Sequence, residues 1–441
     1  MYNYFRAAYY TACLLRHTHW SRKQLLNYQN KKMRKIVKYA YENVPFYHEK
    51  FRQLEIKPED VKTIEDLKKL PIMKRDELQK NTERLTSREF DVDKLKMTST
   101  SGSTGRPLFT YLSKKEEEFR HAKLLRPHIV CGQKPRDKWA LIGPPQHSKK
   151  VNRLQKFLGV YTPIFVSVFD AVSEQISAIE KIRPAVLDGY SSSLFLLAKE
   201  IEKNWIDTIR PRFSMGGAEL IDGPSRKFIE NIFGAPYYDQ YASEEFQMMA
   251  WQCPEKLGYH IDADTILMEF VDNDGEEVAL GEKGEIVCTS FFNYAMPMIR
   301  YGSSDIGIPS EEAECQCGRT LPKMKVIEGR KESIVKLPDG RSLSPLAIGD
   351  CMCAFKYFTH VFQYRFIQKK IDFFKILLKK RDNSVDDEVM KVELLEHLRK
   401  MLKLSEAEAT FEIVFMDEIP PEKTGKIRKV VSELENKGKF I

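Results

Sequence analysis

The segment TSTSGSTGRP, Thr98 to Pro107, offers no apolar side chain to a hydrophobic core. It holds three threonines, three serines, two glycines, one arginine and one proline. Glycines let the backbone turn tightly and approach a ligand closely, while hydroxyls and successive main-chain N–H groups can surround an anion. The segment lacks the Gly-Lys-Ser/Thr ending of the Walker phosphate loop. By itself it predicts either an anion-binding loop or an ordinary surface turn.

Apolar runs and amphipathic stretches alternate from Thr98 to about Ile327, a pattern typical of an α/β domain. Polar or glycine residues directly follow several of the apolar runs. Ligands of an open α/β sheet bind at the carboxyl ends of its strands, so we expect several site segments on one side of the sheet. The segments are WALIGPP (139–145), AVLDGYSSSLFLLAKEI (185–201), IRPRFSMGGAEL (209–220) and APYYDQYASEE (235–245).

The pattern of apolar and polar residues changes near Gly329 and predicts a small α+β unit after it. We expect a hairpin that turns at Asp339-Gly340, two strands within 364–380, a helix over 386–404 and a final strand over 410–419. The predicted domains are 1–97, a basic aromatic helical region that belongs to the large domain, 98–328, the core of that domain, and 329–441, the small C-terminal domain.

Positive charge concentrates in the first fifty of the 441 residues. The whole chain has 71 Lys and Arg against 63 Asp and Glu, a net charge of +8, and Met1–Lys50 alone has ten basic and two acidic residues, again +8. This arm either contacts an anionic membrane or another acidic partner, or it is the charged outer face of a docking helix. Ser21 and Gln24 predict a capping box at the start of a helix. The predicted apolar stripe of that helix is Leu26, Met33, Ile36, Val37 and Ala40.

Targeting signals are absent from the pattern of apolar residues. No uncharged apolar stretch approaches the ~18 to 20 residues of a membrane span, and AAYYTACLL (7–15) lacks a secretory cleavage signature. Eight cysteines are too few for a disulfide scaffold in a chain of this length. We therefore expect a cytoplasmic protein, and leave a peripheral membrane contact open. The basic arm has no groove-reading or base-stacking module, so no nucleic-acid partner is expected, and nothing predicts the oligomeric state.

Six segments, taken in order, resemble the motifs of the acyl-adenylate-forming enzymes. TSGSTGRP (100–107) is similar to their phosphate loop, and together the six segments span about three quarters of the chain. The others are GGAEL (216–220), similar to the adenine-side segment; YASEE (241–245), the tyrosine-to-glutamate motif; IRYGSSDIG (299–307), the ribose-binding aspartate motif; EGRK (328–331), the interdomain hinge; and PPEKTGKIRK (420–429), the terminal lysine loop.

Within that superfamily the chain most resembles the phenylacetate-CoA ligases and their relatives encoded among capsule polysaccharide genes. KIVKYAYENVPFYHEKF (35–51), AWQCPEKLGYHI (250–261) and CQCGR (315–319) carry this resemblance. It implies a two-domain adenylate-forming fold, with a large N-terminal α/β domain and a small mobile α+β C-terminal domain.

The resemblance also implies an activity. The enzyme would use ATP and magnesium to convert a small-molecule carboxylic acid into an acyl-AMP, release pyrophosphate, and transfer the acyl group to CoA. One alternative keeps the adenylation and transfers the acyl group to an amine or hydroxyl in polysaccharide biosynthesis. Another is a non-catalytic, nucleotide-binding partner protein stabilised by zinc.

The same resemblance assigns site residues. Lys426 would place its ammonium between the attacking carboxylate and the α-phosphate, and Arg106 would add a second cation. Glu245, or Glu244 if the register is shifted, would bind magnesium. The hinge is expected at Glu332 or Ser333. The phosphate-loop residues are Ser101, Gly102, Ser103, Thr104 and Gly105, and the other nucleotide-binding residues are Gly217, Ala218, Glu219, Tyr241 against adenine, Asp305 on the ribose, and Arg330.

Three positions depart from the family pattern. Ala242 and Ser304 stand where glycine is usual, and Gly302 stands where arginine is usual. The departures favour the non-catalytic alternative slightly. The retention of Glu245, Asp305 and Lys426 favours catalysis more strongly.

Cysteines and one histidine predict a structural zinc site. Cys253, His260, Cys315 and Cys317 offer a soft set of four ligands, the composition of a closed tetrahedral site. The resemblance to phenylacetate-CoA ligases supports zinc there, and the alternative is a set of unrelated buried thiols with a satisfied histidine. The CMCAFKYF segment (351–358) is apolar, so we expect its two cysteines in the core.

Overall fold

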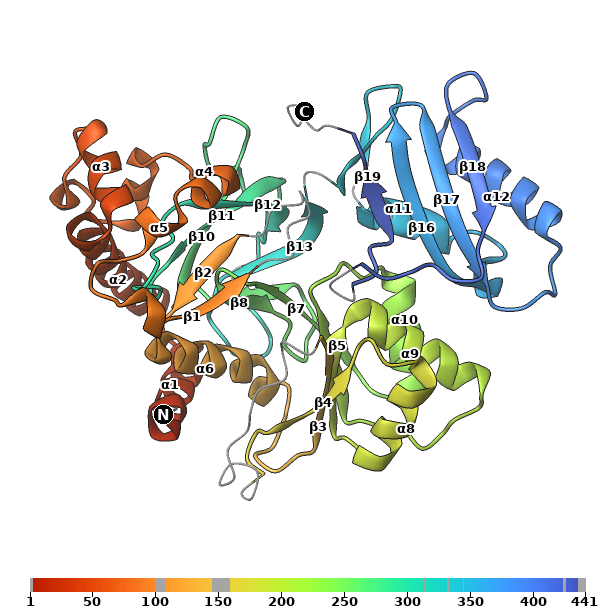
Figure 1. Cartoon of the computed structure of the whole chain (residues 1–441), viewed down its shortest axis with the longest axis horizontal. Helices are drawn as coiled ribbons and strands as arrows, with labels where there is room; N and C mark the ends of the chain where they lie inside the picture. The colour runs from red at the N-terminus through yellow and green to blue at the C-terminus, as the bar shows by residue number, and fades with distance from the viewer. Residues whose placement is uncertain are drawn as a thin grey trace. The chain divides into compact units, whose positions relative to one another are not determined.

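The computed structural model describes residues 3–99, 108–144, 159–312, 314–330, 333–343, 345–422 and 426–434. Figure 1 shows the chain coloured from its N-terminus to its C-terminus. Internal contacts divide it into two compact units. Unit 1 combines Met1–Gln133 with Tyr238–Val326, and unit 2 combines Lys134–Tyr237 with Ile327–Ile441. Each unit is therefore built from two stretches that are far apart in the sequence. None of the helices described combines the length and the apolar composition needed to span a bilayer.

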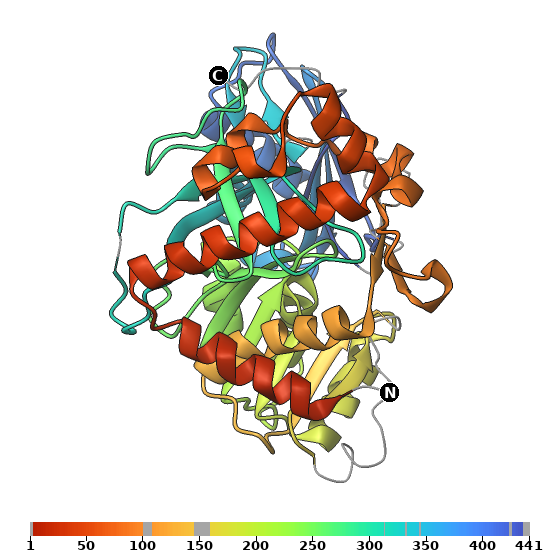
Figure 2. The ribbon, with the colours of Figure 1, turned by 90° about the vertical axis from the view of Figure 1, so that its left-hand side faces the viewer.

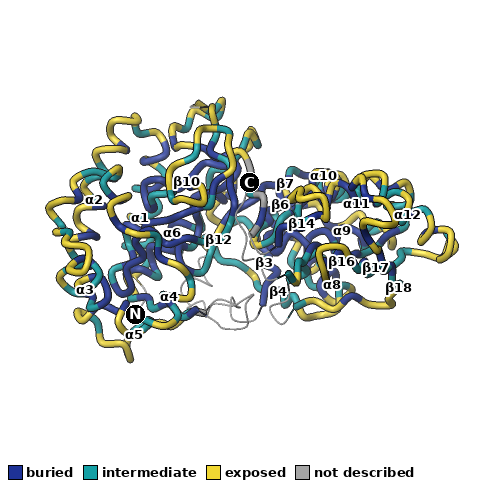
Figure 3. The backbone as a smooth tube through the Cα atoms, turned by 90° about the horizontal axis from the view of Figure 1, so that it is seen from above, coloured by how far each residue is buried: buried dark blue, intermediate teal, exposed yellow. Residues whose placement is uncertain are grey.

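The basic N-terminal arm of unit 1 forms helices α1 (Tyr4–His17) and α2 (Arg22–Asn43). The capping box at Ser21 and Gln24 is present as predicted. The predicted stripe is wrong at one position, because Leu25 is buried whereas Leu26 is exposed. One residue is a rotation of about 100° around a helix, so only one of two neighbouring leucines can face the core. Figure 2 shows α1 alongside α6 (Lys114–Val130), and Figure 3 shows buried and exposed residues alternating along α2.

The remaining elements of unit 1 include a mainly antiparallel sheet of seven described strands, in the order β10-β11-β12-β13-β9-β8-β7. The strands are β7 (Tyr237–Ser243), β8 (Gln247–Trp251), β9 (Tyr259–Ile261), β10 (Ile266–Val271), β11 (Gly284–Ser290), β12 (Tyr301–Pro309) and β13 (Lys323–Arg330). A separate hairpin joins β1 (Lys96–Ser99) to β2 (Phe109–Leu112). The other helices are α3 (Pro45–Gln53), α4 (Arg75–Lys80) and α5 (Thr82–Leu85), with 3-10 helices at Pro58–Asp60, Ile64–Lys69 and Val92–Lys94.

The first stretch of unit 2 is a parallel α/β layer, as the alternating pattern predicts. Its strands run in the order β6-β5-β3-β4. Apolar side chains such as Ile142, Leu187, Leu194 and Ile229 form a core between the strands and the helices. The elements are β3 (Trp139–Gly143), β4 (Pro163–Ser167), α8 (Val172–Ile182), β5 (Val186–Tyr190), α9 (Ser191–Lys203), β6 (Phe213–Gly217) and α10 (Gly223–Phe233).

The second stretch of unit 2 is an α+β layer with its own apolar core around Phe366, Phe374 and Leu394. The predicted hairpin is present, with Gly340 at its turn in the left-handed region (φ +88°). The strand predicted to be final is followed by another, β19, and the sheet runs β18-β17-β16-β19. The elements are β14 (Val335–Lys336), β15 (Ser342–Leu343), α11 (Pro345–Cys353), a 3-10 helix (Phe358–His360), β16 (Val361–Lys370), β17 (Phe373–Lys380), α12 (Asp387–Leu402), β18 (Thr410–Phe415) and β19 (Val430–Ser432).

The two cysteines of α11 differ from each other. Cys351 is buried in the core of this layer, as expected. Cys353 is only half-buried, and its Sγ lies 3.3 Å from Oδ1 of Asp222. The expectation that both thiols lie in the core is therefore right for the first and wrong for the second, because a carboxylate faces the second.

Candidate active site

Glu245 is a buried carboxylate in the turn between β7 and β8 of unit 1. The hydroxyl of Tyr301 lies 3.3 Å from its Oε1, and a guanidinium nitrogen of Arg75 lies 3.7 Å from the same oxygen. The side-chain amide of Asn293 donates to the main-chain carbonyl of Glu245 at 2.9 Å, which fixes the turn. Glu244, the other residue considered for magnesium, is half-buried and its carboxylate lies 3.9 Å from Arg120.

The two residues expected on adenine and on the ribose meet in unit 1. The hydroxyl of Tyr241, on β7, donates to Oδ2 of Asp305 on β12 at 2.6 Å. Burial raises the pKa of Tyr241 well above its ordinary value, so the phenol keeps its proton and acts as the donor. The main-chain N–H of Asp305 donates to the Ser303 hydroxyl at 3.1 Å, which orients this part of the strand.

Two of the departures from the family pattern have a structural basis. A Cβ added at Gly302 would lie 2.9 Å from Oε1 of Glu285 and 3.2 Å from a side-chain carbon of Ile72, so the strand leaves little room there. The Gly302 N–H also donates to the Met73 carbonyl at 3.0 Å. Ser304 has a left-handed backbone (φ +63°), the conformation that glycine adopts most easily. The serine thus keeps a glycine-like backbone at a position where the family pattern has glycine.

In unit 2 the GGAEL segment forms the end of β6 and the turn after it. A Cβ at Gly216 would lie 1.9 Å from the Tyr237 hydroxyl, so this position requires glycine. Gly217 ends the strand, and Ala218 is in the left-handed region (φ +65°). This backbone turns Glu219 toward the start of α9, where its Oε2 accepts the Ser192 N–H at 3.0 Å.

The terminal lysine loop reaches the same strand end. Oε1 of Glu219 accepts the main-chain N–H of Ile427 at 2.6 Å. The ammonium of the preceding residue, Lys426, lies 5.7 Å from the centre of the Tyr190 ring. Burial raises the pKa of Glu219, and the charge of Lys426 opposes that shift. Lys429 pairs with Asp222 at 2.8 Å and anchors the other end of the segment.

The four predicted metal ligands form one cluster in unit 1, with ligand atoms all within 4.8 Å of one another. The Sγ atoms of Cys253 and Cys315 are 3.6 Å apart, and Sγ of Cys317 lies 3.3 Å from Nε2 of His260. Nδ1 of His260 lies 3.4 Å from the Leu321 carbonyl, which leaves Nε2 directed at the thiols. Burial raises the pKa of Cys253 to about 12 and lowers that of His260 to about 4. A neutral imidazole is the form that binds a metal.

Known proteins resemble the chain over most of its length. A phenylacetate-coenzyme A ligase of Thermus thermophilus is 25% identical over 392 residues, which are 85% of this chain and 82% of the relative. The protein CapK of Staphylococcus aureus is 23% identical over 429 residues, 93% of this chain and 90% of the relative. A crystal structure of 2-hydroxyisobutyryl-CoA ligase in the postadenylation state matches 95% of this chain and 91% of its own with a TM-score of 0.79 at 17% identity. No family model matches the chain.

The chain is thus similar in sequence to phenylacetate-CoA ligases and to CapK, and it shares the fold of an acyl-CoA ligase. The structural match confirms the fold class expected of a superfamily member, a large α/β part with a smaller C-terminal α+β part. The domain boundaries near 98 and 329 stay predictions.

Several residues that the superfamily pattern assigns lie outside the described part of the chain. The phosphate-loop residues Ser101, Gly102, Ser103, Thr104, Gly105 and Arg106 are among them, as is Glu332 at the expected hinge. Arg330 is described only by its backbone, which ends β13. Ser333 is described and is buried. The roles of these residues remain predictions.

The structure adds three residues that the superfamily motifs did not assign, Arg75 and Tyr301 beside Glu245 in unit 1 and Asp222 beside Lys429 in unit 2. Arg75 belongs to no recognisable motif, so nothing in the sequence indicated that it lies beside Glu245. Tyr301 lies inside the quoted aspartate motif, and its hydroxyl could have been noticed. Asp222 follows GGAEL by two residues, and its pairing with Lys429 depends on a contact across more than two hundred residues.

Proposed function

We propose that the chain activates a carboxylic acid with ATP, forms an acyl-adenylate with release of pyrophosphate, and transfers the acyl group to CoA. The observation that carries the proposal is the hydrogen bond from the Ile427 N–H to the Glu219 carboxylate. It brings the segment of Lys426 to the strand end that carries Gly217 and Ala218. Positioning and electrostatic stabilisation, rather than covalent chemistry by the protein, are what phosphoryl transfer needs.

Lys426 would act on the reacting atoms. An oxygen of the substrate carboxylate forms a bond to the α-phosphorus, the bond from that phosphorus to the bridging oxygen breaks, and pyrophosphate leaves with the electron pair. An ammonium between the carboxylate and the α-phosphate offsets the negative charge that these groups bring together. A point charge on a long flexible stem suits this task, and the Tyr190 ring lies beneath it.

Glu245, Tyr241 and Asp305 would hold the nucleotide and its metal. The contacts of the Glu245 carboxylate to Tyr301 and Arg75 are 3.3 and 3.7 Å, longer than close hydrogen bonds, so its oxygens suit a hard cation such as magnesium. Bound magnesium would neutralise charge on the phosphates. Asp305 would exchange its bond from Tyr241 for bonds from the ribose hydroxyls.

Zinc fits the cluster of Cys253, His260, Cys315 and Cys317 in unit 1. Three thiols and an imidazole are a usual ligand set for a structural zinc site, and the Leu321 carbonyl orients the imidazole from behind. Four protein ligands leave no open position, so the ion would stabilise the β8–β9 region and take no part in the reaction. Metal analysis of the purified protein, with Cys317→Ser as the comparison, tests this assignment: zinc at one equivalent in the wild type and a loss in the variant are expected.

The basic arm supports a finer proposal about partners. In α1, Phe5 is 91% exposed and Tyr9 is 66% exposed; Arg16 is exposed at the end of the same helix, and Arg22 and Lys23 are exposed at the start of α2. Exposed aromatic rings and exposed basic side chains in one arm of the chain suit the surface of an anionic membrane. Co-sedimentation with vesicles of anionic lipid, compared with neutral vesicles, tests this proposal. Equal binding to both kinds of vesicle, or binding to neither, would instead favour the alternative that the arm is the charged outer face of a docking helix.

The proposed activity is tested by carboxylate-dependent exchange of pyrophosphate into ATP, with magnesium, across aryl, fatty, amino and sugar acids. Exchange with some acid in the wild type, and its loss in Lys426→Ala, is expected. CoA, amine and hydroxyl acceptors are then offered to the acyl-adenylate, because the acceptor separates the proposed ligase from its nearest alternative. ATP binding by a folded wild-type protein without exchange on any acid would instead favour the non-catalytic partner protein.

A further inference from the structure

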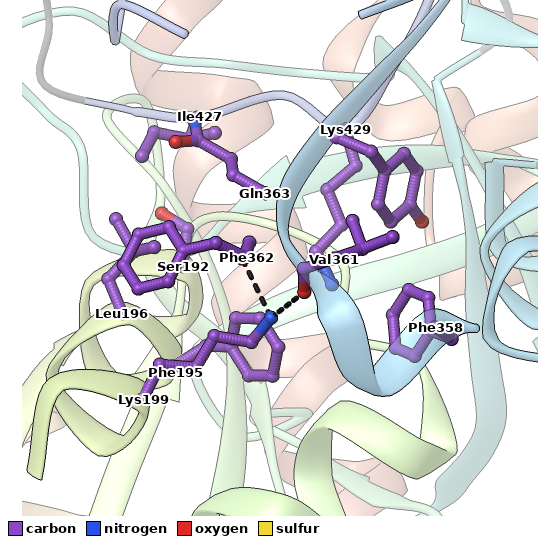
Figure 4. Close-up of a pocket in the computed structure, with 11 residues that line it drawn as sticks. Ser192, Phe195, Leu196, Lys199, Phe358, Val361, Phe362, Gln363, Ile427 and Lys429 are labelled. Atoms are coloured by element: carbon purple, nitrogen blue, oxygen red, sulfur yellow. Dashed lines mark hydrogen bonds between the residues drawn. The ribbon is translucent and has the colours of Figure 1, made fainter. Parts of the chain in front are cut away.

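Lys199 is a buried lysine that the proposed chemistry does not use. It lies on α9, and its side chain is almost completely buried, with the residue 4% exposed. Its ammonium nitrogen donates to the main-chain carbonyls of Val361 and Phe362, the second at 2.8 Å (Figure 4). The two carbonyls belong to the start of β16, more than 160 residues along the chain.

The surroundings of Lys199 are aromatic rather than acidic. The ring centres of Phe195, Phe362 and Phe358 lie 4.9, 5.5 and 5.9 Å from its nitrogen. Glu202, one turn further along α9, pairs with Arg381 instead. The adjoining cavity is about 20 Å³, the room of a single water molecule, and so it does not accommodate a substrate. Removing a lysine from water without an opposite charge is unfavourable, and packing alone would be served better by an apolar side chain.

The strand that Lys199 holds is connected to the catalytic lysine. β16 pairs in parallel with β19, in the register of Phe366 opposite Val430. The Phe366 N–H donates to the Lys429 carbonyl at 2.7 Å. The segment from Lys426 to Lys429 leads directly into β19. A displacement of the start of β16 from α9 therefore moves the backbone that carries Lys426.

We propose that Lys199 is a positioning residue for adenylation: it fixes the start of β16 against α9, and through β19 it holds the Lys426 segment against Glu219. The inference rests on the proposed function for its catalytic consequence. Main-chain carbonyls are suited as acceptors for this contact, because breaking it leaves no buried carboxylate behind. Two hydrogen bonds from a buried ammonium to main-chain carbonyls thus hold the start of β16 firmly against α9.

The test compares Lys199→Met with Lys199→Arg and with Lys203→Met. Methionine keeps the apolar stem and removes the donor, arginine keeps a donor, and Lys203 is an exposed lysine one turn further along the same helix. Pyrophosphate exchange in Lys199→Met is expected to fall by about 10- to 100-fold, the size of effect that a small misplacement of a reacting group produces. Transfer from a supplied acyl-adenylate to CoA is expected to change by less than about 3-fold, because the CoA thiol attacks the acyl carbon in that step, whereas Lys426 is proposed to act on the earlier bond formation at the α-phosphorus. Lys199→Arg should recover part of the exchange, and Lys203→Met should match the wild type.

A second readout is independent of activity. Hydrogen exchange at the Ile427 and Phe366 amides, both bonded in the arrangement described, is expected to become faster by at least about 10-fold in Lys199→Met and to stay unchanged in Lys203→Met. If the wild type adenylates no acid, the proposed function fails while the amide measurement still decides whether Lys199 holds the segment. Wild-type amide protection in Lys199→Met, or an equal loss in both half-reactions, would overturn the positioning role.

Discussion

Glu245 in unit 1 and Glu219 in unit 2 are both glutamates that the motif resemblance assigns, and their surroundings within their own units differ. The carboxylate of Glu245 faces two side chains at 3.3 and 3.7 Å. The carboxylate of Glu219 accepts two main-chain N–H groups at 3.0 and 2.6 Å. Backbone amides cannot rotate away, whereas the hydroxyl and the guanidinium facing Glu245 can. The difference indicates that Glu245 is suited to bind a ligand, whereas Glu219 is suited to hold the backbone of neighbouring segments in place.

The largest effect that would sharpen this comparison is expected at Glu245. Glu245→Gln removes the negative charge that a magnesium ion needs, so pyrophosphate exchange should fall by about 100-fold or more. Titration of the exchange rate with magnesium checks the cause, since the requirement should shift to higher concentration. Glu244→Gln is the matched control. A larger loss in the control than in Glu245→Gln would transfer the metal role to Glu244.

The next effect is expected at Lys123, which contacts the main chain of the residue after Glu245. Lys123 on α6 is 3% exposed, and its ammonium donates to the carbonyl of Phe246 at 2.8 Å. Lys123→Met leaves that carbonyl without its donor, so the free energy of unfolding should fall by about 2 to 3 kcal/mol. Urea unfolding measures the loss, and Lys115→Met, an exposed lysine on the same helix, should change the stability by less than about 0.5 kcal/mol. Equal stability of the two variants would contradict the structural role of Lys123.

A smaller effect is expected at Glu219. Glu219→Gln keeps one carbonyl oxygen as an acceptor for the Ser192 or the Ile427 amide, so exchange should fall by only about 10-fold. Glu219→Ala removes both acceptors and should lower it further. The KM for ATP and kcat are measured separately, because a displaced Lys426 segment lowers kcat more than it raises KM. If Glu219→Gln were as damaging as Glu245→Gln, the distinction between the two carboxylates would break down.

The smallest effect is a dependence of stability on pH from Lys199. Burial lowers the pKa of Lys199 from 10.5 to about 7; Arg381 and Lys429 act in the same direction, and Glu202 and Cys353 oppose it. Between about pH 7 and pH 10 the folded protein therefore binds fewer protons at this position than the unfolded chain, so stability rises with pH across this window. In Lys199→Met the number of protons taken up on unfolding should be lower by up to about one. Unfolding in urea at several pH values measures this number, and an unchanged slope would contradict the burial of a titrating Lys199.

Local patterns in the sequence determined much of the fold. The helix start at Ser21, the hairpin turn at Gly340 and the strands around Phe366 and Phe374 follow from capping, turn chemistry and alternation between near neighbours. The stripe position at Leu26 was wrong because the sequence offered two adjacent leucines, and only packing selects which of them faces the core. The strand β19 was missed because it is three residues long and depends on pairing with β16.

The candidate site residues were also proposed from the sequence, because the segments assigned as phosphate loop, metal-binding glutamate and terminal lysine each have a recognisable motif around them. Which residues lie next to one another was decided only by the tertiary structure. Three contacts join residues that are 64 or more positions apart in the sequence: Arg75 with Glu245, Tyr241 with Asp305, and Lys199 with the carbonyls of β16. The physical reason is that hydrogen bonds and buried charges depend on which strands the fold brings together, and no local pattern of side chains encodes that distance.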